Sequence, residues 1–206
     1  EWCCGFPLLS SGMTEEVKMI AMHNIAKVAE KGAKTLVTSC PSCFHTWKHE
    51  YEEITGVAAE FEIMHISQYL LKLVESSKII PGQTDVSVTY HDPCDLGRNS
   101  GIYDEPRQLI KSIPGVKLIE MTARMKQANC CGGGGNIESL NPSLSAKIAD
   151  CRANEVISTG AEIVVSACQQ CERTLGTSLK KKKKEIDYKI KVMDISELLL
   201  LSMQKT

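Results

Sequence analysis

Two long stretches of the chain carry apolar residues at helical spacing. Residues 13–30 show this pattern before Gly32, and residues 143–158 show it before Gly160. A glycine just after the last apolar position is typical of a helix end. The pattern therefore predicts two long amphipathic helices, each of which stops near a glycine.

Short apolar or β-branched runs lie between the helical stretches and predict strands. Two further helical patterns follow, at residues 67–74 and 196–203. Strands that alternate with helices imply parallel pairing, so we predict the α/β fold class. The predicted strands cover residues 35–38, 61–64, 86–90, 116–121, 163–166 and 188–193.

The cysteine motifs occur twice, at a nearly constant interval. Cys3-Cys4-Gly5 recurs as Cys130-Cys131-Gly132, and the CxxC motif of Cys40–Cys43 recurs as Cys168–Cys171. Each CxxC motif follows a predicted strand and precedes a predicted helix. The repetition predicts two pseudo-repeated, Rossmann-like units with parallel sheets and with cluster-binding loops at the C-terminal ends of strands.

We assign residues 1–80 to the first repeat and residues 81–206 to the second. The second repeat opens with the strand at residues 86–90, which leads into His91-Asp-Pro-Cys94. The first repeat lacks this opening. We therefore expect the sequence to be a piece of a longer protein whose preceding segment carries a cysteine equivalent to Cys94.

The composition supports a folded protein with an unusual number of thiols. Ten cysteines in 206 residues is high for a chain that is too long for a small disulfide scaffold. The net charge of −1 gives no electrostatic reason to expect a nucleic-acid partner. With no signal peptide and no apolar run of about 18 residues, we expect a cytoplasmic chain without a membrane span of its own.

The clustered cysteines indicate metal ligation rather than core packing. A CxxC motif at a helix start directs two sulfurs to one point, where the helix dipole stabilises thiolate. The adjacent Cys130 and Cys131 point to opposite sides of an extended backbone, which suits a multi-iron centre better than one tetrahedral ion. Gly132 and Gly133 let the backbone approach a bulky group. A phosphate-binding loop is disfavoured because the glycines lack the Lys-Ser/Thr of a P-loop.

The motifs resemble those of the cysteine-rich CCG domain in the B/D-like family of heterodisulfide reductase iron-sulfur proteins. The resemblance covers essentially the whole chain and extends to iron-sulfur subunits of glycolate, lactate and glycerol-3-phosphate oxidation. The matching motifs are Cys3-Cys4-Gly5-Phe-Pro, Cys40-Pro-Ser-Cys43, His91-Asp-Pro-Cys94, Cys130-Cys131-Gly132 and Cys168-Gln-Gln-Cys171.

The resemblance implies that five cysteines of the second repeat hold a noncubane [4Fe-4S] cluster that cleaves a disulfide. The set is Cys94, Cys130, Cys131, Cys168 and Cys171. The first repeat departs from the family pattern because its leading cysteine is not in this chain. Its remaining thiols then hold a second iron-sulfur cluster, a Zn²⁺ ion or nothing: Cys3, Cys4, Cys40 and Cys43.

The sequence is compatible with three functions. The first is an oxidoreductase subunit that passes electrons to a disulfide. The second is an electron-transfer subunit of a glycolate-, lactate- or glycerol-3-phosphate-type complex or a quinone-linked membrane complex, without disulfide chemistry. The third is a structural zinc protein. For the first two we expect a flavin, ferredoxin-type or membrane cytochrome subunit as partner. A membrane partner would place the cytoplasmic chain at the inner face of the membrane.

Other residues have competing interpretations. His91 either relays a proton to a departing thiolate, which would make it catalytic, or orients the turn before Cys94. Cys151 lies within the second long helix, without a partner at motif spacing, and is expected to be a buried structural thiol. The lysine run at residues 180–184 is interpreted as a solvated helix end, with a docking surface for an acidic partner as the alternative.

Overall fold

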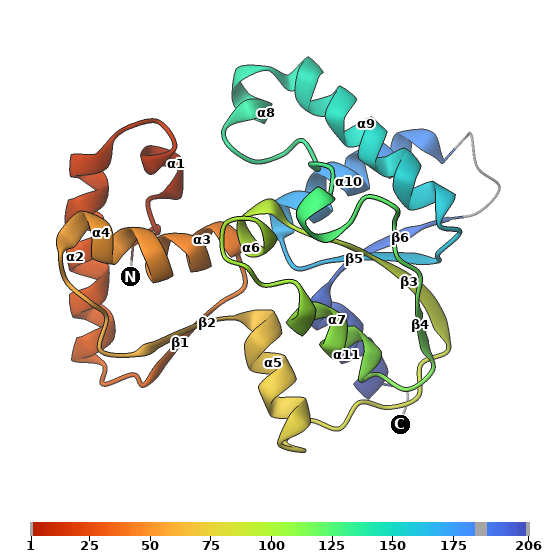
Figure 1. Ribbon diagram of the computed structural model, residues 1–206, viewed down its shortest axis with the longest axis horizontal. Coiled ribbons are helices and arrows are strands. Elements are labelled where there is room, and N and C mark those ends of the chain that lie inside the picture. Colours follow the sequence, from red (N-terminus) through yellow and green to blue (C-terminus); the bar gives the residue numbers. More distant parts are fainter. Residues whose placement is uncertain (1, 184–188, 205–206) are drawn as a thin grey trace. The chain divides into compact units, whose positions relative to one another are not determined.

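The computed structural model describes residues 2–183 and 189–204 of the chain. These residues form two compact units, Glu1–Ile66 and Ser67–Thr206 (Figure 1). Each unit has its own parallel sheet, so we describe each by itself.

The first unit builds a two-stranded parallel sheet and a set of helices beside it. In α2, Glu15 and Glu16 occupy the first turn, where the helix dipole favours negative charge, and Gly32 follows the end of the helix at a φ of 63°. Strands β1 and β2 pair from Thr35 with Glu62 to Thr38 with His65. The elements are α1 (Phe6–Leu9), α2 (Thr14–Glu30), β1 (Thr35–Thr38), α3 (Pro41–His45), the π-helical turn η1 (Thr46–Glu50), α4 (Tyr51–Thr55) and β2 (Glu62–His65).

The second unit contains a four-stranded sheet. Its last helix begins with a capping box between Asp194 and Glu197, which satisfies backbone N–H groups at the helix start. The elements are α5 (Ile66–Glu75), β3 (Val86–His91), α6 (Cys94–Gly97), α7 (Asp104–Lys111), β4 (Val116–Leu118), the 3-10 turn η2 (Met125–Gln127), α8 (Ile137–Leu140), α9 (Pro142–Ser158), β5 (Ile163–Ser166), α10 (Gln169–Lys182), β6 (Lys191–Asp194) and α11 (Ile195–Met203).

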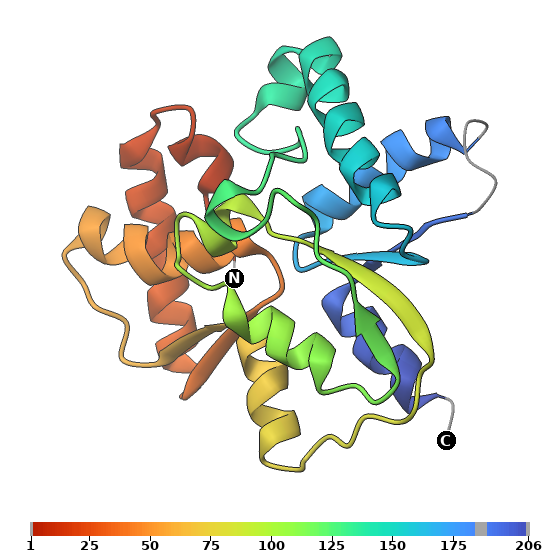
Figure 2. The same cartoon turned by 45° about the vertical axis from the view of Figure 1, so that its right-hand side comes forward.

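All strand pairs of the second unit are parallel, in the order β4-β3-β5-β6. Helices α9 and α10 pack together on one side of this sheet, and α7 and α11 lie on the other side (Figures 1 and 2). Every residue of β5 is buried, from Ile163 to Ser166, as expected for a central parallel strand. The unit is therefore a three-layer α/β/α sandwich.

The strand order places a topological switch point between β3 and β5. From β3 the chain moves outward to β4, and from β5 it moves outward to β6 on the opposite side. Loops that leave the carboxyl ends of two such strands diverge, which opens a crevice where ligands bind in α/β proteins. The loops after His91 and Ser166 are therefore the expected location of a binding site.

The predicted α/β fold class with parallel sheets is confirmed. Strands β1 and β5 have the predicted bounds, and the helices lie within two residues of their predicted starts. The strand expected at residues 116–121 is wrong in its second half, because β4 ends at Leu118 and Met121 is buried in a loop instead. Tyr188, the predicted start of the last strand, lies outside the described residues, as does Lys184 of the lysine run.

None of the helices over residues 2–183 and 189–204 combines the length and the hydrophobicity that a membrane crossing requires.

Candidate metal centre

The carboxyl ends of β3 and β5 bring two cysteine motifs to one edge of the sheet. His91, the last residue of β3, is paired with Ser166, the last residue of β5. Three residues after His91, Cys94 opens helix α6. Two residues after Ser166, Cys168 precedes helix α10. The switch point of the sheet therefore gathers cysteines that are far apart in the sequence.

The second CxxC motif forms the start of α10. Cys168 is the N-cap, in an extended conformation with φ −158° and ψ 115°, and Cys171 lies in the first turn. Only 7% of Cys168 and 3% of Cys171 are exposed. Both sulfurs thus lie at the positive end of a helix dipole, which favours thiolate, and are shielded from water, which disfavours an uncompensated thiolate.

The Cys130-Cys131 loop is packed tightly against α9 and α10 through its glycines. Gly132 has a φ of 82°, and a Cβ atom there would lie 2.4 Å from the backbone oxygen of Ser145. The Ser145 hydroxyl donates a hydrogen bond of 2.6 Å to the Gly132 carbonyl. A Cβ atom on Gly133 would lie 2.7 Å from the side-chain nitrogen of Gln170. Only glycine fits at position 132, whereas a side chain at position 133 would require Gln170 and Thr174 to move. This close packing holds the loop that carries Cys131.

The five sulfurs of the second unit form one electrostatic cluster. Hydrogen bonds from Cys130 and Cys171 lower the pKa of Cys131, which favours its thiolate form. The same bonds raise the pKa of Cys130 and, together with a bond to Cys168, the pKa of Cys171. Burial raises the pKa of Cys94 to about 11, and the charges of Asp95, Cys131 and Cys168 add to this effect. Cys94 is therefore close enough to Cys131 and Cys168 for their charges to act on it.

His91 lies directly at this cluster. Its ring nitrogen and the sulfurs of Cys131 and Cys171 are all within 4.8 Å of one another, a grouping that could hold a metal ion. The buried Arg152 of α9 donates from Nε to Nδ1 of His91 over 3.0 Å. Arg152 also donates to the Ala123 carbonyl over 2.8 Å. A buried charged residue thus connects the helix layer to the site.

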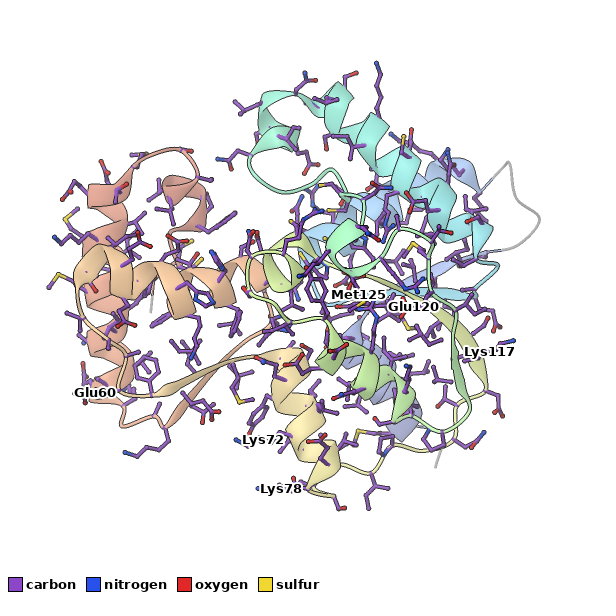
Figure 3. The ribbon with its side chains drawn as sticks, in the orientation of Figure 1. Glu60, Lys72, Lys78, Lys117, Glu120 and Met125 are labelled. Carbon is purple, nitrogen blue, oxygen red and sulfur yellow. The ribbon has the colours of Figure 1, made fainter. Side chains whose placement is uncertain are left out.

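A second buried ionic network fixes the turn between His91 and Cys94. Arg107 of α7 makes a bidentate pair with Asp92, at 2.7 and 2.9 Å. The same guanidinium binds Glu120 at 2.7 Å, and the Met125 backbone N–H donates to Asp92 over 2.8 Å. Figure 3 labels Glu120 and Met125 in the segment after β4. These contacts hold the loop that delivers Cys94.

The first unit gathers its own thiols at the start of α3. The sulfurs of Cys4 and Cys43 lie 3.2 Å apart. A hydrogen bond from Cys43 lowers the pKa of Cys4 to about 7 and that of Cys40 to about 6, while the pKa of Cys43 is raised. Cys3 is exposed but also bonds to Cys4. Cys4, Cys40 and Cys43 therefore form one group in which Cys43 is the proton donor.

Two buried polar side chains hold the backbone of the first cysteine pair. Asn24 of α2 donates to the Cys3 carbonyl over 3.2 Å and to the Tyr51 hydroxyl over 3.0 Å. Tyr51 in turn donates to the Cys4 carbonyl over 2.9 Å. Gly5 follows with a φ of 84°, close to the value at Gly132 in the second motif.

The structure corrects one sequence expectation and adds a residue that was missed. Cys151 is exposed rather than buried. The buried stripe of α9 instead includes Ala149, Arg152, Ala153 and Val156. Arg152 lies on an otherwise apolar stripe of the predicted helix, which is one signal of its burial, although a charged residue is rarely found there.

The donor set fits a soft metal or a metal-sulfur centre. Thiolate ligands, a helix dipole and a glycine-rich loop are the features that hold iron-sulfur clusters and zinc. The Nη2 atom of Arg152 is buried and has no hydrogen-bond partner among the described residues. This unsatisfied donor is a further indication of a bound group with acceptor atoms near the thiols. The fold and the site together define a cysteine-rich α/β protein with a thiolate centre at a sheet switch point.

The chain belongs to the CCG cysteine-rich domain family, whose model matches residues 1–48 and 88–176. It is 34% identical, over 99% of its length, to a subunit of the dihydromethanophenazine:CoB–CoM heterodisulfide reductase of Methanosarcina acetivorans. It is also 34% identical, over 96% of its length, to a subunit of the CoM/CoB fumarate reductase of Methanothermobacter marburgensis. The chain spans 51% and 38% of these two relatives, respectively.

Among solved structures, a glutamate racemase from Campylobacter jejuni superposes with a TM-score of 0.37 and 8% identity, over 93% of this chain and 80% of the racemase. A superposition this loose carries no argument about function.

Proposed function

We propose that this chain is the iron-sulfur-binding part of an oxidoreductase that delivers electrons to a disulfide. The centre would be a noncubane [4Fe-4S] cluster. One observation carries the proposal, namely that cysteine-bearing loops meet at the switch point of the second sheet, where His91 and the sulfurs of Cys131 and Cys171 lie within 4.8 Å of one another. The proposed ligands are Cys94, Cys130, Cys131, Cys168 and Cys171.

Similar proteins support the oxidoreductase part of this proposal. A heterodisulfide reductase subunit and a fumarate reductase subunit match the chain along nearly its whole length. Because the chain spans only about half of the first relative, the activity, substrate and partners of the whole protein are part of the proposal.

The residues around the thiols have distinct tasks. When bound, such a cluster supplies single electrons and an iron site that accepts the sulfur of a disulfide. Burial of Cys131, Cys168 and Cys171 keeps water from the centre. Gly132 and Gly133 allow the backbone to approach it closely. His91 presents a polar group to the sulfurs at the same edge.

The proposal is tested on the full-length protein, purified without oxygen. Iron and acid-labile sulfide are measured first, and an EPR spectrum is then recorded before and after addition of a disulfide or a thiol. We expect iron, sulfide and a spectrum that changes with the added sulfur compound. A cluster with an inert spectrum would reject disulfide chemistry, and zinc without iron would reject the cluster itself.

A second candidate is electron transfer without disulfide chemistry, inside a dehydrogenase or a quinone-linked complex. The observation that favours it is the similarity to a subunit of a fumarate reductase, a protein named for a different reaction. An inert spectrum combined with reversible one-electron reduction would favour this candidate.

We further propose that the first thiol group holds a second iron-sulfur cluster or a Zn²⁺ ion. The short distance between Cys4 and Cys43 and the lowered pKa of Cys40 support a cation site there. The partners would be other redox subunits, of the flavin, ferredoxin or membrane cytochrome type, with the chain in the cytoplasm at the inner face of the membrane. Co-purification without oxygen would identify these partners.

A further inference from the structure

Arg152 is a fully buried cation whose position is set by the helix on which it lies. It occupies the inner stripe of α9 between Ala149 and Ala153, and none of its surface is exposed. Burial lowers its pKa, but a guanidinium remains protonated in proteins. Glu155, one turn along the same helix, accepts a hydrogen bond of 2.5 Å from its Nη1. Arg152 is therefore a permanent hydrogen-bond donor at a fixed position.

The bond from Arg152 to His91 determines the protonation pattern of the imidazole ring. The Nε–H group of Arg152 points at Nδ1 of His91 over 3.0 Å. An arginine side chain has donors only, so Nδ1 must offer its lone pair and cannot carry a proton. In a neutral imidazole the single proton then resides on Nε2. His91 is only 1% exposed, so water does not compete for either nitrogen.

This protonation pattern decides how His91 interacts with the sulfurs. One ring nitrogen of His91 lies within 4.8 Å of the Cys131 and Cys171 sulfurs, and His91 hydrogen-bonds to Cys131. Since Nδ1 accepts from Arg152, we assign the bond to Cys131 to Nε2. A protonated Nε2 has no lone pair for a metal ion but can donate to a thiolate. Loss of that proton would leave an imidazolate, which disfavours a proton relay through this ring.

We propose that Arg152 is a positioning residue that holds His91 as an Nε2–H donor to the cysteine sulfurs and prevents His91 from acting as a metal ligand. The proposal rests on the proposed function for its redox consequence, but the tautomer itself does not depend on which metal is bound. It assigns His91 to sulfur hydrogen bonding and leaves the ligation to the thiols. Hydrogen bonds to cluster sulfurs stabilise the reduced, more negative state and raise the reduction potential.

The test uses the full-length protein with its metal centre and with ¹⁵N-labelled histidine. Electron-nuclear double resonance on the paramagnetic cluster should show an exchangeable proton near it and no nitrogen bound directly to iron. A strong ¹⁵N coupling, as from an iron-bound imidazole, would overturn the proposal.

Variants at residue 152 distinguish the effect of the N–H hydrogen-bond donor from that of the positive charge. Arg152→Met removes both, and we expect a lower midpoint potential. Arg152→Gln keeps an N–H donor without the charge, and Arg152→Lys keeps both, so these two variants should recover part of the shift. His91→Leu should lower the potential as Arg152→Met does, whereas His91→Gln, with an amide near the Nε2 position, should lower it less. An unchanged potential in both Arg152→Met and His91→Leu would contradict the assignment.

Failure of the proposed function can be distinguished from failure of this inference. If the protein holds zinc and no iron, the proposed function fails, and the tautomer is then determined from long-range ¹H–¹⁵N NMR spectra of the diamagnetic protein. A protonated Nε2 and an unprotonated Nδ1 on His91 would still support the role of Arg152. The opposite tautomer, or a zinc–nitrogen bond, would refute it.

Discussion

The two units of this chain carry the same short motifs in different electrostatic settings. In the first unit, Cys43 shares hydrogen bonds with Cys4 and Cys40, and both partners have a lowered pKa. In the second unit, one thiolate, Cys131, accepts bonds from Cys130 and Cys171. Nearly identical cysteine spacing therefore does not give the same pattern of thiol pKa shifts.

The second unit differs because β3 adds residues that the described part of the first unit does not contain. Strand β3 ends at His91 and delivers Cys94 to the site. His91 then connects to Arg152, and Asp92 connects to Arg107. The leading strand β3 thus brings both a fifth thiol and the contacts to the buried cations Arg107 and Arg152.

The largest expected effect is the loss of the second centre in Cys131→Ser. Cys131 is buried and interacts with Cys130 and Cys171. The hydroxyl of serine is a poor ligand for soft metals. We expect the iron bound by the second unit to be lost, measured as iron and sulfide per chain. Cys151→Ser, at an exposed thiol on α9, is the control and should retain the full iron content.

Arg107→Met should destabilise the second unit strongly. It leaves Asp92, only 5% exposed, as an uncompensated buried charge, which costs about 3–5 kcal/mol. Denaturant unfolding measures the change. The matched control is Arg173→Met, whose ion pair with Glu138 lies at the surface and should contribute about 1 kcal/mol or less. Equal losses in the two variants would show that the Asp92 network does not organise the loop.

Gly132→Ala should cost about 2–4 kcal/mol, because it combines a positive φ with a Cβ contact of 2.4 Å to backbone. Gly134→Ala is the control in the same loop, since its Cβ would meet nothing within 4 Å. Gly5→Ala in the first unit should cost less, because its closest Cβ contact is 3.3 Å, to a side chain. Equal unfolding free energies for all three variants would show that close packing around Gly132 does not stabilise the protein.

The smallest and most specific effect concerns thiol reactivity in the metal-free protein. Cys40 and Cys94 are both half-buried, but their pKa values are about 6 and about 11. Thiolate is the reactive form, so iodoacetamide should modify Cys40 at pH 7 and slow down as the pH falls below 6. Cys94 should react only in strong alkali. Peptide mapping by mass spectrometry measures the rate of modification at each cysteine. Equal rates for Cys40 and Cys94 at pH 7 would contradict this prediction.

Much of the fold could be predicted because its signals are local. The period of apolar residues predicted α2 and α9, and β-branched runs predicted β1 and β5. The short β4 was overestimated, because the apolar Met121 is buried by a loop rather than by a strand.

The site was only partly accessible from the sequence. Cysteine spacing led to the five-thiol set, whose ligand role stays a proposal. The buried cations Arg107 and Arg152 could not be recognised, because their partners are distant in the sequence and charged residues are rarely buried. Asn24 and Tyr51 could not be predicted as site residues either, because their contacts to the Cys3-Cys4 backbone depend on tertiary structure.

We propose that the five thiols of the second unit hold an iron-sulfur cluster without ligands from the first unit. The direct measurement is iron and sulfide per chain, under anaerobic conditions, in a variant with Cys3, Cys4, Cys40 and Cys43 all replaced by Ser. We predict roughly four iron and four sulfide per chain, the content of one [4Fe-4S] cluster. A folded variant that holds no iron, or holds zinc in its place, would contradict the account.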